Sequence, residues 1–158
     1  TSLVGSDVVF GKSMDGTGAG SLDAVGFTAA GDAVARCAWI YVVMLEDASA
    51  ATTTVAVGVY TNGAGDAPET RLAQATITSL VAGWNHAPLD APVTIASGED
   101  VWLSYSPSAG AIVTEVDGTC GARLYQHTDD NDAGGAPPSF VTTNTFTDSC
   151  NTAIYLGP

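Results

Sequence analysis

The chain has 158 residues, of which 46% are hydrophobic, and its 17 acidic and 4 basic side chains leave a net charge of −13. So few cations exclude a surface for nucleic acid or for an anionic membrane. No apolar run approaches the roughly 20 residues of a membrane-spanning helix, so membrane insertion is also excluded. The length suits one domain with its own hydrophobic core, and we take residues 1–158 as that domain.

Short runs rich in Val, Ile, Thr and aromatic residues alternate along the chain with clusters of Gly, Pro, Asn, Asp and Ser, a texture typical of all-β proteins. In chain order, strands are expected at 7–12, 24–28, 34–45, 53–61, 72–78, 84–87, 93–95, 100–106, 111–116, 123–126, 139–143 and 152–156. No segment keeps a helical apolar period for three turns. Closely spaced strands with turns between them predict a β-sandwich or a barrel.

The N-terminal segment 1–12 contains a short apolar run, Val8-Val9-Phe10. We expect it to form the first strand of the sandwich, or a strand that exchanges between subunits and completes a neighbour's sheet. The chain starts at Thr1 rather than at a methionine or a signal segment. We therefore expect a processed secreted chain, or a module of a longer one.

The loop 62–68, with the sequence NGAGDAP, follows a strand-like run and contains two glycines. A phosphate-binding loop requires a Lys-Ser/Thr pair at its end and a helix whose N-terminus faces the phosphate, and neither follows here. We therefore predict a turn between two strands. Pro88 and Pro92 lack the N–H that a ladder needs, so they are expected at strand ends or on an edge strand.

Three cysteines occur, Cys37, Cys120 and Cys150. We predict a disulfide between Cys120 and Cys150, with Cys37 buried and free in an apolar strand. Three cysteines allow three single pairings, and three free thiols in a reducing compartment are the alternative.

The acidic segment 127–135 offers Asp129, Asp130 and Asp132 as oxygen ligands of the kind that calcium prefers. Its spacing is not that of an EF-hand. The alternatives are a solvated loop and a structural calcium site, and no other cofactor is expected.

Aromatic side chains are the best ligand-binding material in the sequence, because sugar rings stack on flat apolar faces. Trp39 and Tyr41 lie two residues apart and therefore on one face of the same strand, which is either core or a binding platform. Burial of large aromatic residues favours the core. Tyr125 is the least constrained candidate for a glycan contact. His86 is expected to be packed or simply exposed.

Several ordered motifs resemble a widespread family of secreted jelly-roll modules: VAVGVYTNGAGDAPETRLAQATI, then VAGWNHAPLDAPVTIASGEDVWLSYS, then APPSF and a final AIYLG. The family looks like accessory modules of bacterial extracellular enzymes and adhesins and like surface or virion appendage domains, and many members are similar to carbohydrate-binding modules. The resemblance implies a jelly-roll-type β-sandwich of antiparallel strands. It also implies that Trp84 and Trp102 pack in the core, and it carries no catalytic motif.

No GxSxG, HExxH or SxxK pattern is present, so we do not expect an enzyme. The expected function is non-catalytic glycan recognition or adhesion, outside the cell or at a cell or virion surface. The alternative is a structural subunit of an extracellular filament, surface layer or virion appendage, in which the partner is a neighbouring copy of the chain.

Overall fold

The computed structural model describes residues 3–9, 13–46, 53–109, 111–116, 123–127, 135–140, 144–146 and 152–158. Its elements are the strands β1 (Val4–Gly5), β2 (Ser13–Gly18), β3 (Leu22–Thr28), β4 (Ala33–Glu46), β5 (Val55–Asn62), β6 (Pro68–Ile77), β7 (Gly83–Ile95), β8 (Asp100–Pro107), β9 (Ala111–Val116), β10 (Arg123–His127), β11 (Asn144–Phe146) and β12 (Ile154–Gly157). No helix in these residues is long and apolar enough to cross a membrane.

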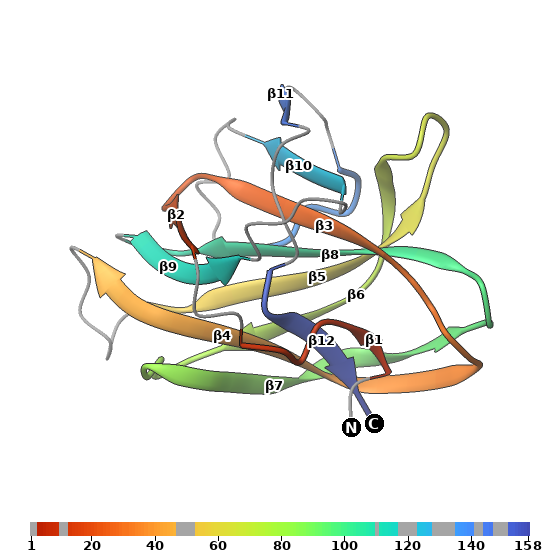
Figure 1. Cartoon of the computed structure of the whole chain (residues 1–158), viewed down its shortest axis with the longest axis horizontal. Coiled ribbons are helices and arrows are strands. Elements are labelled where there is room, and N and C mark those ends of the chain that lie inside the picture. The colour runs from red at the N-terminus through yellow and green to blue at the C-terminus, as the bar shows by residue number, and fades with distance from the viewer. Residues whose placement is uncertain are drawn as a thin grey trace.

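The strands form two antiparallel sheets that pack face to face (Figure 1). Sheet I has the order β1-β12-β4-β9-β2, with β7 paired along the other edge of β4. Sheet II has the order β11-β10-β3-β8-β5-β6. The expected all-β sandwich of antiparallel strands is therefore confirmed.

The pairing follows the scheme of a jelly roll, in which a long antiparallel ribbon is rolled up. The two ends of this ribbon meet where β1 pairs with β12. The successive pairs along the ribbon are then β3 with β8, β4 with β7, and β5 with β6. The remaining four strands are additions: in sheet I, β9 pairs with the end of β4 and β2 pairs with β9, while β10 and β11 extend sheet II beyond β3. The predicted jelly-roll type is thus confirmed by the strand order.

Alternating side chains from both sheets fill the space between them, as the two-residue period of a strand requires. Ile40 on β4 and Val57 on β5 are fully buried there, together with Leu103 on β8 and Leu156 on β12. The middle layer is built mainly of Val, Ile, Leu and Ala side chains, and Tyr105 is also fully buried in it. The tryptophan side chains, by contrast, lie on the outer faces of the two sheets.

Residues 135–140, which we name the strap, cover part of the outer face of sheet II. Phe140 packs its ring edge-on against buried Tyr60, with ring centroids 5.4 Å apart. The Tyr60 hydroxyl donates a hydrogen bond to the carbonyl oxygen of Pro137 at 2.8 Å. Arg71 on β6 also donates to the carbonyl oxygen of Ala136. The strap therefore closes a second, smaller hydrophobic cluster.

Trp102 lies in this second cluster and is fully buried, so its predicted core packing is confirmed. Its indole N–H donates to the side-chain oxygen of Asn62 at 2.8 Å, at the start of the loop 62–68. In that loop Gly63 N–H donates to the carbonyl oxygen of Ala67 at 2.7 Å, which closes a turn between β5 and β6. The prediction of a turn is confirmed.

Strand β7 is longer than the two short strands predicted at 84–87 and 93–95. It runs through Pro88 and Pro92. Its register with β4 shifts between Ala35, which pairs with Val93, and Cys37, which pairs with Pro88. The prolines are tolerated because β7 pairs with no described strand other than β4, so it is an edge strand. Their expected position on an edge is confirmed.

The strand expected at 7–12 is wrong in position, because the first strand is β1. Val4 reaches the core from β1, whereas Val8 and Val9 are 53% and 42% exposed. The motif Gly-Trp-Asn has a structural role at the start of β7. There the amide of buried Asn85 donates to the carbonyl oxygens of Val81 and Gly83, both at 2.8 Å.

We predict that alkaline pH weakens the fold through Tyr60. Burial, outweighing the opposite effects of Ser104 and Arg71, raises the pKa of the Tyr60 hydroxyl well above its ordinary value. Above pH about 10 the unfolded chain loses this proton while the folded chain keeps it, so the free energy of unfolding falls by up to about 1.4 kcal/mol per pH unit. Urea unfolding between pH 9 and pH 11.5 measures the decline. The decline should be shallower in Tyr60→Phe, and an equal decline in both proteins would contradict the prediction.

Candidate functional site: an aromatic surface on sheet I

Five aromatic rings from three neighbouring strands gather on the outer face of sheet I, and we name this set the aromatic surface: Trp39, Tyr41, Trp84, His86 and Tyr155. Their position follows from the alternation along the strands. On β4 the residues Ala38, Ile40 and Val42 are fully buried in the core, so the residues between them point outward. His86 is exposed, and the other four side chains are half-buried.

Three of these rings form a row across the sheet. Trp39 lies directly opposite His86 on β7 and directly opposite Tyr155 on β12. Its indole stacks on the imidazole with centroids 4.1 Å apart and planes 11° apart, and on the phenol ring with values of 5.6 Å and 5°. Because β7 and β12 flank β4 on opposite sides, both faces of the Trp39 indole are covered. The row therefore presents ring edges to solvent.

The indole plane of Trp84 is steeply inclined to the ring of Tyr155 in this row and to the ring of Tyr41. Its ring makes an angle of 78° with Tyr41, its cross-strand neighbour, and of 71° with Tyr155. The centroids of these pairs are 5.3 Å and 5.1 Å apart, which is the separation of edge-to-face contacts. Among the described residues, no ring stacks in parallel on Trp84. Its indole, unlike that of Trp39, is therefore not enclosed between two parallel rings.

The chemistry of the aromatic surface is polar but largely uncharged. The hydroxyl of Tyr155 has a raised pKa, because the ring is partly desolvated and because the negative charge of Asp7 opposes its ionisation. At neutral pH it is therefore a neutral donor and acceptor. The hydroxyl of Tyr41 and the imidazole of His86 add further hydrogen-bonding groups beside the apolar rings.

A glycine makes room for the row. Gly157 lies two residues after Tyr155 on β12 and thus on the same face of the sheet. A Cβ atom at this position would lie 3.1 Å from the Trp39 indole nitrogen and 3.5 Å from Cδ1. The indole therefore leans over the backbone of β12, and a side chain at position 157 would push it away.

Two of the three predicted glycan residues lie on the aromatic surface. Trp39 and Tyr41 share one face, as expected, but the expectation that this face is core is wrong, because the alternate residues Ala38, Ile40 and Val42 fill the core instead. Core packing of Trp84 is also wrong, since it is half-buried on the outer face. Tyr125 lies on β10 in sheet II, so the structure does not bring it to this surface.

Tyr155 was not among the predicted site residues, and His86 was given no binding role. The sequence does contain a signal for Tyr155: it interrupts the apolar pair Ile154 and Leu156, both of which are fully buried. A large aromatic residue between two core residues of a strand faces outward. Which strand it lies beside is decided only by the pairing of β12 with β4.

The remaining predicted sites lie largely outside the described residues. This holds for the candidate calcium ligands Asp129, Asp130 and Asp132 and for the predicted disulfide partners Cys120 and Cys150. Cys37 is free, and it is half-buried rather than buried. In the part of the chain that the structure describes, no three His, Cys, Asp or Glu side chains gather to hold a metal ion.

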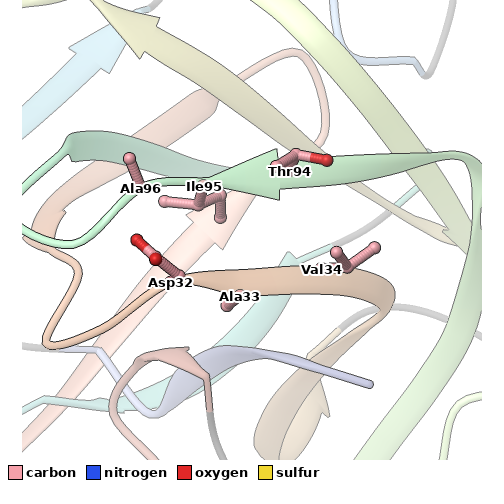
Figure 2. Close-up of a pocket in the computed structure, with 6 residues that line it drawn as sticks. All are labelled: Asp32, Ala33, Val34, Thr94, Ile95 and Ala96. Atoms are coloured by element: carbon pink, nitrogen blue, oxygen red, sulfur yellow. The ribbon is translucent and has the colours of Figure 1, made fainter.

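A pocket of about 450 Å³ lies away from the aromatic surface, at the end of the β4–β7 pairing (Figure 2). It is lined by Asp32, Ala33, Val34, Thr94, Ile95 and Ala96. The Asp32 carboxylate accepts a hydrogen bond from the Ser97 N–H at 2.8 Å, so it is engaged in holding the neighbouring turn. The other five side chains offer one hydroxyl and small apolar groups. The pocket is therefore a weaker candidate site than the aromatic surface.

Comparison of the chain with models of protein families, and with curated protein sequences, finds no match.

We predict that Gly157→Val disrupts the aromatic row. The added methyl groups displace the Trp39 indole from Tyr155, at a cost of about 1–3 kcal/mol in stability for the overpacked site. Near-ultraviolet circular dichroism reports the altered ring stacking, and far-ultraviolet spectra check that the sheets persist. Gly157→Ala, with one small methyl group, serves as the matched control and should change the near-ultraviolet signal less. An unchanged signal in the valine variant would show that Trp39 does not lean over β12.

Proposed function

We propose that the chain is a non-catalytic, extracellular module for glycan recognition or adhesion, and that it binds a neutral glycan on the aromatic surface. One observation carries the proposal: five rings from β4, β7 and β12 gather, half-buried or exposed, on the outer face of a sheet. Sugar rings present apolar C–H faces that pack on indole and phenol rings, while their hydroxyl groups need neutral hydrogen-bonding partners. Both kinds of group are present here.

The charge of the chain supports a neutral ligand. The net charge of −13 repels acidic polysaccharides, and only four basic residues are available to pair with carboxylate or sulfate groups. The tyrosine hydroxyls and the imidazole of the aromatic surface instead suit the hydroxyl groups of uncharged sugars. Within the surface, we assign the main stacking contact to Trp84, because no described ring lies parallel to it and because its indole is larger than the ring of Tyr41, which has no parallel ring either.

The resemblance to carbohydrate-binding modules belongs to the same proposal. It is supported by the jelly-roll order of the strands, but jelly rolls serve many functions, so the strand order alone does not assign one. The assignment of a ligand therefore rests on the aromatic surface.

We predict that Trp84→Ala weakens glycan binding about tenfold or more, because buried tryptophan contacts dominate such surfaces. A glycan array identifies a neutral ligand, and titration calorimetry compares the wild-type protein with the variant. Leu72→Ala, which removes an exposed apolar side chain from β6 in the other sheet, is the control and should bind normally. The proposal fails if no neutral glycan binds, or if a folded Trp84→Ala protein binds as tightly as the wild type.

A second function, as a structural subunit of an extracellular assembly, is favoured by the N-terminal edge of sheet I. Strand β1 has two residues and lies at the edge of the sheet, and the exposed apolar side chains Val8 and Val9 follow it. An edge strand with apolar neighbours is a common site of pairing between chains.

If the chain assembles through this edge, replacing both Val8 and Val9 with serine reduces the assembled fraction. Analytical ultracentrifugation over a range of protein concentrations measures it, with Leu72→Ser as a control for the loss of an exposed apolar residue elsewhere. Sedimentation of the wild-type protein as a monomer at all concentrations would contradict a role as an assembly subunit.

A further inference from the structure

The rings of Tyr155 and His86 cover the two faces of the Trp39 indole, and they differ in how firmly the surrounding residues hold them. On one side, Tyr155 lies on β12, which pairs with β4 on one edge and with β1 on the other, and Trp84 packs against its ring. On the other side, His86 is exposed and lies on the edge strand β7. Trp39 is the aromatic partner of His86 among the described residues. Rotation of the imidazole away from Trp39 therefore disturbs little else.

We propose that His86 is a protonation-sensitive cover over Trp39 and thereby controls glycan binding on the aromatic surface. This inference rests on the proposed function. When the imidazole is neutral it rotates aside, and a sugar ring takes its place against the indole. When it is protonated, the imidazolium is a cation held over the face of a tryptophan, an arrangement that the electrons of the indole ring stabilise. The cover then stays closed, and the ligand loses one of its stacking faces.

The geometry meets the requirements of such an exchange. Ring centroids 4.1 Å apart and planes 11° apart place the imidazole flat against the indole, where a sugar ring would have to lie. Side chains of exposed residues change rotamer within picoseconds to nanoseconds, so uncovering is fast. Histidine in general is the side chain whose ordinary titration falls between pH 5 and pH 8, so the tests compare pH values across that range.

Other titratable or charged groups lie on the elements around His86, and the experiment must separate their effects from that of the imidazole. They are Arg36, Cys37 and Tyr41 on β4, Tyr155 on β12, Asp90 on β7, and Glu69 and Arg71 on β6, which is joined to β7 by a hydrogen bond from Gln74 N–H to Asp90. Replacement of His86 with glutamine removes only the imidazole. It leaves all of these groups in place and keeps a polar side chain of similar reach.

The first test needs no glycan. Tryptophan fluorescence is measured from pH 8 to pH 5, because an imidazolium in contact with an indole quenches its emission. The wild-type protein should lose emission in one titration step, and the step should be absent from both His86→Gln and Trp39→Phe. Trp84 and Trp102 remain in both variants and supply the common baseline. A step of the same size in either variant would overturn the proposal.

The second test compares affinity for a neutral glycan at pH 8 and pH 5 by calorimetry. The wild-type protein should bind about two- to fivefold more tightly at pH 8, the change expected from a cation–π contact at an exposed site. The His86→Gln protein should bind equally at both pH values. Binding that depends on Trp84 but not on pH would overturn the cover and leave the proposed function intact. No binding at either pH would overturn the proposed function and the control of binding with it.

Discussion

The structure depends on the alternation of side chains along β4. This strand pairs with β12 and β9 on one edge and with β7 on the other, so it is the centre of sheet I. Its inward side chains at 38, 40 and 42 are fully buried Ala, Ile and Val, which pack against sheet II. Its outward side chains at 39 and 41 are Trp and Tyr. A shift of one residue in the pairing would exchange the two sets.

The protein has two hydrophobic clusters, and its tryptophans lie outside the main one. Aliphatic side chains make up most of the layer between the sheets, and no tryptophan is among the buried residues of that layer. Trp102 instead packs on the outer face of sheet II, where the strap at 135–140 covers it, and its polar N–H is bonded to Asn62. Trp39 and Trp84 lie on the outer face of sheet I, where neighbouring aromatic rings are their partners. The same residue type thus has a structural role on one sheet and forms a candidate binding surface on the other.

Much of the fold could be predicted from the sequence because the strands carry period-two patterns and are separated by turn residues. The pattern failed where local chemistry was atypical of strands. Residues 13–18, with the sequence SMDGTG, were not predicted as a strand, yet they form β2 through pairing with β9. Pro88 and Pro92 suggested two short strands, whereas an edge position lets β7 continue through both. In each case the tertiary partner outweighed the local propensity.

The sequence by itself determined the all-β class, the shared face of Trp39 and Tyr41, and the shortage of cations. These follow from composition and from side-chain alternation within one strand, which need no knowledge of neighbours. Only the tertiary structure decided that this shared face is the outer one, and that Trp84, His86 and Tyr155 join it from β7 and β12. The reason is that rings on different strands meet only when the register of two separate pairings aligns them, and register is a property of the assembled sheet.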